Sequence, residues 1–157
     1  MNYNLSIIIT TYNEENNIKR CLKNISNQNI LSNINYEIII VDDYSNDKTV
    51  EICKEFTDKI FFSGKKFCEI SRYIGVKNAK YENILFLDAD NFMSEDNLLQ
   101  NLVIAHTENP NTAGLYPYKF DLSPTDSKIN QYCSIFGIND PYQWFLKSTE
   151  HFSYFAK

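Results

Sequence analysis

Two aspartates one residue apart, Asp88 and Asp90, follow an apolar run that begins at Ile84. Such a run predicts a buried strand, and alternate side chains of an extended segment point to the same side. Two carboxylates that meet beyond the end of a strand could hold Mg²⁺ or Mn²⁺, with the phosphates of a substrate completing the coordination shell. A polar turn that closes the strand would use the same residues, because Asp is common in turns. The D-x-D pattern alone leaves both interpretations open.

Further polar residues with candidate chemistry follow the first two apolar runs or lie in a later helical segment. Asp42 and Asp43 could accept hydrogen bonds from a base or a ribose, although helix capping is the commoner use of such a pair. Tyr12 could stack on a base or pack against the core, and Arg72 could offset phosphate charge or remain a solvated cation. Neither a Walker P-loop nor a G-x-G-x-x-G motif occurs, so a bound nucleotide would not lie in a glycine-rich cradle.

Strands and helices that alternate along the chain must position these side chains. Short apolar runs predict strands over 5–9, 36–41, 60–62, 84–87 and 113–119. Between them, a period near 3.6 residues predicts helices whose apolar faces carry Ile18, Cys21, Leu22 and Ile25; Val50, Cys53 and Phe56; Ile70, Tyr73, Ile74 and Lys77; and Leu98, Leu99, Leu102 and Val103. We expect Asn13 to cap the first of these helices and Ser94 the fourth.

Alternation of this kind predicts an α/β fold with a mostly parallel sheet. Crossovers between parallel strands are right-handed, so the carboxyl ends of the strands share one edge of the sheet, where ligands bind. The polar clusters after the first, second and fourth strands all fall at that edge. Their shared location is the feature that no single motif provides.

Composition narrows the classes of protein to consider. The 157 residues suffice for one domain with a full core, and the net charge of −5 argues against a partner that is a nucleic acid. No apolar run is long enough to span a membrane, and the N-terminus lacks the pattern of a signal peptide. The four cysteines form no C-x-x-C pair, and Cys21 and Cys53 fall on apolar helix faces. We therefore expect reduced thiols and a cytoplasmic protein, with the cytoplasmic face of a membrane as an open alternative.

Four segments in this order resemble the family 2 glycosyltransferases, whose nucleotide-sugar-binding domain has the Rossmann-like, three-layer α/β/α GT-A fold. The resemblance runs from about residue 5 to residue 119, and its motifs are 11–14 (TYNE), 41–49 (VDDYSNDKT), 72–79 (RYIGVKNA) and 86–90 (FLDAD). Each motif is common alone, and the four together are specific. A proline common in the first family motif is Thr10 here, a mild departure.

The resemblance implies a role for each matching residue. The expected binding residues for the nucleotide sugar are Thr10, Thr11, Tyr12, Glu14, Asp43, Arg72 and Asp88. Asp88 and Asp90 would be the metal ligands, with Asp90 in direct contact with Mn²⁺ or Mg²⁺. The family activity would be metal-dependent transfer of a sugar, with inversion, from a nucleotide-diphosphate sugar to a glycan or a lipid-linked acceptor. A UDP-sugar is the favoured donor, and biosynthesis of glycans or of the cell envelope is the implied process.

The last part of the chain departs from the family pattern. We expect a nucleotide-sugar-binding domain over 1–120, then over 121–157 the start of an acceptor-side or interface segment that looks truncated. The carboxylate that would deprotonate the acceptor has no good match, and Asp140 is a weak candidate. The alternative function is therefore a non-catalytic nucleotide-sugar-binding or scaffold module. Aromatic residues gather over 129–155, which predicts self-association or contact with a membrane surface.

Overall fold

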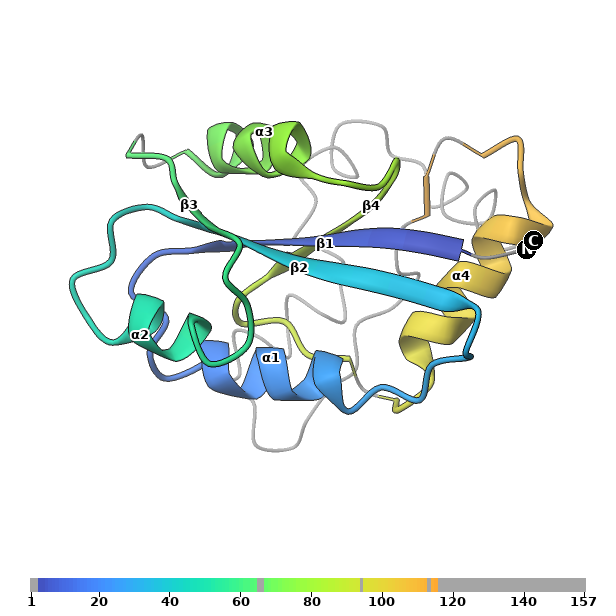
Figure 1. Ribbon diagram of the computed structural model, residues 1–157, viewed down its shortest axis with the longest axis horizontal. Helices are drawn as coiled ribbons and strands as arrows, with labels where there is room; N and C mark the ends of the chain where they lie inside the picture. Colours follow the sequence, from blue (N-terminus) through green and yellow to red (C-terminus); the bar gives the residue numbers. More distant parts are fainter. Residues whose placement is uncertain (1–2, 65–66, 94, 113, 116–157) are drawn as a thin grey trace, which may run out of the picture. The chain divides into compact units, whose positions relative to one another are not determined.

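The computed structural model describes residues 3–64, 67–93, 95–112 and 114–115 (Figure 1). In this part of the chain four strands alternate with four helices. The strands are β1 (Tyr3–Thr11), β2 (Ile34–Asp42), β3 (Ile60–Phe62) and β4 (Asn83–Asp88). The helices are α1 (Ile18–Ser26), α2 (Thr49–Cys53), α3 (Cys68–Asn78) and α4 (Leu98–Glu108). The prediction of alternating strands and helices is confirmed for this part.

The sheet has the order β3-β2-β1-β4, and every strand pair in it is parallel. β1 pairs with both neighbours up to its end, where Thr10 lies opposite Asp88 of β4 and Thr11 lies opposite Asp42 of β2. The polar residues that follow three strands therefore begin at the same edge of the sheet. This register is what positions the candidate site.

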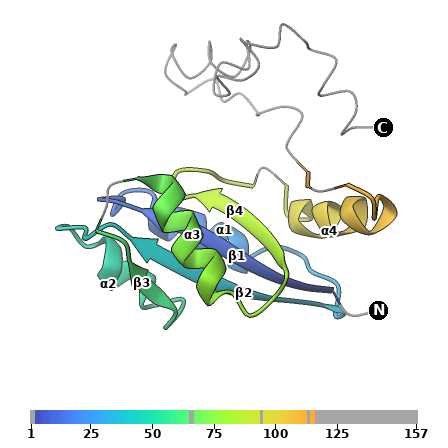
Figure 2. The ribbon, with the colours of Figure 1, turned by 90° about the horizontal axis from the view of Figure 1, so that it is seen from above.

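The sheet is the middle of three layers, with α1 and α2 on one face and α3 on the other (Figures 1 and 2). Ile8 and Ile39 face α3, whereas Ile7 and Ile40 belong to the cluster on the α1 side, and all four are fully buried. Strands covered on both faces need continuous apolar runs, which β1 and β2 have. The three-layer α/β/α prediction is confirmed.

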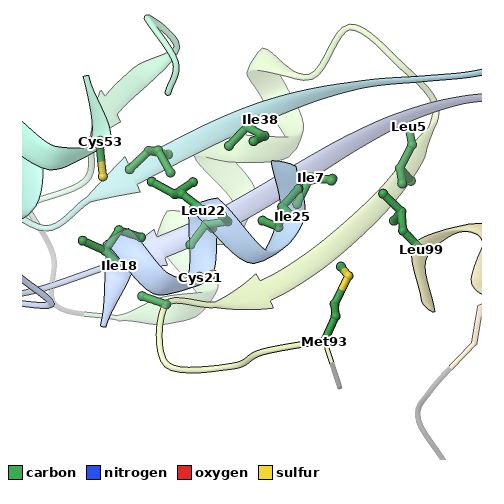
Figure 3. Close-up of a cluster of buried hydrophobic side chains, with 13 residues drawn as sticks. Leu5, Ile7, Ile18, Cys21, Leu22, Ile25, Ile38, Cys53, Met93 and Leu99 are labelled. Atoms are coloured by element: carbon green, nitrogen blue, oxygen red, sulfur yellow. The ribbon is translucent and has the colours of Figure 1, made fainter. Parts of the chain in front are cut away.

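Helix α1 packs with the face that its periodicity predicts. Ile18, Cys21, Leu22 and Ile25 are fully buried. They point toward the sheet and share a cluster with Leu5, Ile7 and Ile38 (Figure 3). Burial of a side chain of this size contributes about 1.5–3 kcal/mol, so this stripe anchors α1 and the loop that precedes it.

The predicted inner face of α3 is wrong except at Ile74, which packs against the cluster of Ile8, Ile39 and Val41. Ile70, Tyr73 and Lys77 are exposed, and the buried residues of this helix are Ser71 and Gly75. A Cβ atom added to Gly75 would lie 2.4 Å from Cγ2 of Ile8, so the helix approaches the sheet more closely than any side chain there allows. Two small residues determine the contact face, and a pattern of large apolar residues could not reveal it.

The predicted starts of two helices are also wrong. α1 begins at Ile18, and Asn13 instead adopts a left-handed conformation with φ 55° in the loop that follows β1. α4 begins at Leu98, later than a cap at residue 94 would place it. Residue 94, most of the expected strand over 113–119 and all of 116–157 lie outside the described residues. The boundary at 120, the role of Asp140 and the behaviour of 129–155 thus stay predictions. No helix in the described ranges is long and apolar enough to cross a membrane.

Candidate functional site

A pocket of about 440 Å³ lies at the carboxyl edge of the sheet. The residues that line it come from the ends of β1, β2 and β4 and from the first half of α3: Thr10, Thr11, Tyr12, Glu14, Asp43, Phe67, Cys68, Ser71, Arg72, Asp88, Ala89 and Asp90. Every residue that the family resemblance suggested for nucleotide-sugar or metal binding is among them, whereas Asp42 is not. The structure brings these residues together, because the parallel register aligns the strand ends.

The loops after β1 and β2 form the wall of the pocket, and hydrogen bonds join them in both directions. The backbone N–H of Asn13 donates to Oγ of Ser45 at 2.8 Å, and the N–H of Asn46 donates to Oδ1 of Asn13 at 2.9 Å. The N–H of Lys48 donates to Oε2 of Glu15 at 3.1 Å. Asn tolerates the left-handed conformation better than most residues, so Asn13 can turn the chain here and accept this bond.

Asp42 holds the base of these loops. It is fully buried, and its carboxylate accepts three hydrogen bonds: from Oγ1 of Thr11 at 2.9 Å, from N of Ser45 at 2.7 Å and from Oγ of Ser45 at 2.6 Å. A buried charge needs such donors, because burial without them is costly. Neither Asp42 nor Asp43 caps α2. Lys48 precedes α2 as its N-cap and makes no side-chain capping bond, while the carboxylate of Asp47 accepts a hydrogen bond from N of Thr49, the first residue of α2, at 2.9 Å.

Asp43 has a different environment from its neighbour. Its backbone N–H donates to the carbonyl oxygen of Thr11 at 2.9 Å, which continues the β1–β2 pairing. Its Oδ1 accepts a hydrogen bond from Oγ of Ser63 at 2.8 Å. No hydrogen bond from the described residues reaches Oδ2. Asp43 lines the pocket with only 9% of its surface exposed, so it can present an oriented acceptor to a ligand.

The two aspartates of the D-x-D segment differ in their contacts. Asp88 ends β4, and its Oδ1 lies 3.1 Å from Nη2 of Arg72, whose guanidinium also lies over the ring of Phe86 at 5.7 Å. Both charged side chains are more than a third exposed, so this ion pair contributes little to stability. Either partner can therefore bind a ligand instead at little cost. Asp90 is exposed and makes no hydrogen bond or ion pair with the residues that the structure describes. Ala89 between them is buried.

The carboxylates at the end of β4 suit a metal ion whose coordination shell a substrate completes. Within the described ranges no group of three or more His, Cys, Asp or Glu side chains could hold a metal by itself. Mg²⁺ in phosphate-transfer sites commonly takes one or two carboxylates from the protein and fills its remaining positions with waters and phosphate oxygens. Asp88 and Asp90 supply that number, so the residues present fit the implied metal.

Asn24 of α1 and Gln28 in the loop just after it hold the segment that follows Asp90, a feature that the sequence analysis missed. Asn24 accepts a hydrogen bond from N of Met93 at 2.7 Å and donates to its carbonyl oxygen at 3.0 Å. Gln28 accepts from N of Leu99 at 3.0 Å and donates to the carbonyl oxygen of Glu95 at 2.9 Å. Gln28 lies two residues beyond the end of α1, and no sequence pattern marks either residue as a contact of this segment.

Two thiols near the site have opposite exposure. Cys21 of α1 is fully buried beneath the D-x-D turn, with Sγ 4.0 Å from the carbonyl oxygen of Asp88. Burial, helped by the negative charges of Asp90 and Asp88, raises the pKa of Cys21 to about 12. Cys68 at the start of α3 is exposed and lines the pocket. Cys21 is therefore an unreactive core residue, whereas Cys68 is accessible from the pocket.

The family described as Glycosyl transferase family 2 matches residues 6–155. The chain belongs to this family. The resemblance inferred from the four motifs is confirmed, and so is the expectation of a GT-A fold, which the similar solved structures share.

Curated relatives of this family 2 chain are glycosyltransferases. A dolichyl N-acetyl-α-D-glucosaminyl phosphate 3-β-D-2,3-diacetamido-2,3-dideoxy-β-D-glucuronosyltransferase of Methanococcus voltae is 36% identical over 109 residues, covering 65% of this chain and 33% of the relative. The poly(ribitol-phosphate) β-N-acetylglucosaminyltransferase TarP of Staphylococcus aureus is 32% identical over 97 residues, covering 58% of this chain and 29% of the relative. The chain thus spans about a third of the length of these two relatives.

Solved structures give the same fold. TarS 1-349 of S. aureus matches with a TM-score of 0.61 at 22% identity, covering 82% of this chain and 44% of the other. The same protein in complex with UDP-GlcNAc matches with a TM-score of 0.57 at 24% identity, covering 82% and 42%. Mannosyltransferase PcManGT of Pyrobaculum calidifontis, in complex with GDP-Man and Mn²⁺, matches with a TM-score of 0.57 at 21% identity, covering 66% and 32%.

Proposed function

We propose that the pocket binds a nucleotide-diphosphate sugar and that the protein transfers the sugar to a glycan or a lipid-linked acceptor. The observation that carries this proposal is the pocket of about 440 Å³, whose lining includes at least one residue from each of the four family motifs. The donor in the TarS complex is UDP-GlcNAc, and the names of the relatives include polymer and dolichyl phosphate acceptors. A UDP-sugar is the donor that we propose.

The residues of the pocket suggest how the donor is held. Asp43 would accept an N–H of the base, and Tyr12, 44% exposed, would offer its ring to the base. Arg72 would turn from Asp88 to the phosphates, because an exposed pair gives up little when it separates. Asp88 and Asp90 would hold Mn²⁺ or Mg²⁺, whose chemistry here is Lewis-acid stabilisation of the departing nucleotide diphosphate.

The transfer that we propose proceeds with inversion. An acceptor hydroxyl attacks the anomeric carbon as the bond from that carbon to the phosphate oxygen breaks. A carboxylate takes the proton of the hydroxyl. The sequence offers no good match for the carboxylate that the family uses in this step, and Asp140 stays a weak candidate. The cytoplasmic location and the contact of 129–155 with a second copy or a membrane surface are proposals that rest on the sequence.

Calorimetry with UDP, in the presence of Mn²⁺ and again with EDTA, tests the donor site. We expect affinity to fall by at least about tenfold in EDTA, because carboxylates and phosphates repel each other without a cation between them. Asp90→Asn should reproduce this loss in Mn²⁺. Equal affinity under both conditions would remove the metal role from Asp88 and Asp90.

Transfer itself needs a product assay. Mass spectrometry of products from a panel of UDP-sugars and glycan or lipid-linked acceptors separates an active transferase from a binding module. A chain that binds UDP tightly and forms no product with any acceptor would support the non-catalytic alternative. A chain that binds no nucleotide would contradict both functions.

A further inference from the structure

We infer that Ser63 is a positioning residue that makes Asp43 select a pyrimidine with an N3–H group, uracil or thymine, over guanine. This inference rests on the proposed function, because it requires a nucleotide base beside Asp43. Ser63 does not line the pocket, so it acts through the carboxylate that does. The fold alone leaves the base open, since similar structures hold UDP-GlcNAc in one case and GDP-Man in another.

The position of Ser63 is fixed by the sheet. Phe62, the last residue of β3, pairs with Asp42, and the backbone N–H of Ser63 donates to the carbonyl oxygen of Asp42 at 3.1 Å. The pairing of β2 with β3 therefore continues for one residue beyond the strand. This bond brings Oγ of Ser63 within 2.8 Å of Oδ1 of Asp43.

An aromatic contact supports the same turn. The rings of Tyr44 and Phe62 stack with centroids 5.2 Å apart, and Tyr44 adopts a left-handed conformation with φ 58°. Gly64 has φ 63°, and a Cβ atom there would lie 2.9 Å from Cε2 of Tyr44. The residues on both sides of Ser63 and Asp43 are thus packed against each other. This packing keeps the hydroxyl in place before a ligand arrives.

The hydrogen bond leaves Asp43 with one carboxylate oxygen to which no described residue donates. Guanine presents two adjacent donors, N1–H and the N2 amino group, which match the two oxygens of a carboxylate. Uracil and thymine present one donor, N3–H, between two carbonyl oxygens. If Ser63 already donates to Oδ1, then Oδ2 serves the single N3–H. The hydroxyl also offsets the negative charge of Oδ1, which would otherwise face a carbonyl oxygen of the pyrimidine.

Calorimetric titration of the full chain with UDP, dTDP, GDP and CDP in Mn²⁺ tests the inference. We expect UDP and dTDP to bind at least about tenfold tighter than GDP and CDP. In Ser63→Ala the ratio of UDP to GDP affinity should fall by about tenfold, which corresponds to the loss of one hydrogen bond to a charged group. Ser63→Thr keeps the hydroxyl and should restore the ratio.

A matched control separates base selection from stability. Like Ser63, Thr57 has a hydroxyl that donates a hydrogen bond to the β2 segment. Its acceptor is the carbonyl oxygen of Ile38 at 2.9 Å, which lies far along the strand from Asp43. Thr57→Ala should lower the melting temperature without changing the ratio of UDP to GDP affinity. An equal loss of affinity for all four nucleotides in Ser63→Ala would show a merely structural role and overturn the inference.

A measurement on the unaltered chain does not depend on the folding of a variant. UDP methylated at N3 of uracil lacks the single donor, so it should bind at least about tenfold more weakly than UDP. Affinity equal to that of UDP would overturn the inference. Binding of no nucleotide at all would overturn the proposed function together with it. If UDP binds tightly and Ser63→Ala leaves the ratio of UDP to GDP affinity unchanged, only the role of Ser63 is overturned.

Discussion

Asp42 and Asp43 are adjacent in the sequence, but they should respond to mutation in opposite ways. Asp42 is fully buried, whereas 9% of Asp43 is exposed at the wall of the pocket. Three hydrogen bonds end on the carboxylate of Asp42, and one ends on that of Asp43. Replacement of each by Ala therefore tests which of the two supports the loops and which serves the ligand.

The expected loss of stability in each variant follows from the hydrogen-bond donors that the substitution leaves without a partner. In Asp42→Ala, N–H of Ser45 cannot reorient, and the buried hydroxyl of Thr11 and the half-buried hydroxyl of Ser45 lose a charged acceptor. At about 1–3 kcal/mol for an unsatisfied buried donor, with partial relief by rotation of the hydroxyls, the free energy of unfolding should fall by about 3–5 kcal/mol. In Asp43→Ala only the hydroxyl of Ser63 loses its partner, so the loss should stay near 1 kcal/mol.

Urea unfolding followed by circular dichroism, together with calorimetric titration of UDP, measures both effects. Asp43→Ala should keep most of its stability and lose about 1–3 kcal/mol of binding free energy for UDP, with its metal dependence unchanged. Asp42→Ala should be the less stable variant. The reasoning would be refuted if Asp43→Ala unfolded first, or if Asp42→Ala were as stable as the parent chain.

Three further predictions concern the elements around the pocket. Gly75→Ala should destabilise the fold by about 1–3 kcal/mol, because the new Cβ would lie 2.4 Å from Ile8, whereas Val76→Ala at an exposed position should be nearly neutral in the same urea titration. Burial raises the pKa values of Cys21 and Cys53 to about 12, so both should resist iodoacetamide at pH 8. Exposed Cys68 should react, and UDP should protect it. Mass spectrometry of the alkylated protein in a Cys133→Ser background tests this. Gln28→Ala should weaken Mn²⁺-dependent binding of UDP more than binding in EDTA, and an equal loss under both conditions would limit Gln28 to a structural role.

The sequence predicted most of the features that depend on where the strands end. Apolar runs located β1, β2, β3 and β4, and parallel pairing then required the residues that follow them to meet at one edge. The pocket therefore contains the residues that the family resemblance predicted, even though two predicted helix starts were wrong. Periodicity and topology are sufficient for this level of detail, because both depend on backbone geometry rather than on individual contacts.

Features that depend on a single contact could not be predicted in this way. The inner face of α3 is determined by Ser71 and Gly75, and small residues carry no hydrophobic signal. Asn24 looks like an ordinary polar position of a helix and Gln28 like a polar loop residue, although each bonds the backbone of a segment about 70 residues away. Asn13 was expected to cap a helix because Asn is a common cap residue. Its side chain does accept a backbone N–H, but that N–H belongs to Asn46 in the opposite loop.

The bonds between the two loops also limit how this site can be inherited or transplanted. Four backbone N–H groups, those of residues 13, 15, 46 and 48, end on side chains of the opposite loop, and the N–H of residue 14 ends on Thr49 at the start of α2. If one loop were replaced by its counterpart from a relative, the other loop would lose acceptors that only its original partner supplies. A chimaera should therefore tolerate exchange of both loops better than exchange of either alone. The two segments, whose bonded residues lie 32–35 positions apart in the sequence, form a single unit of substitution.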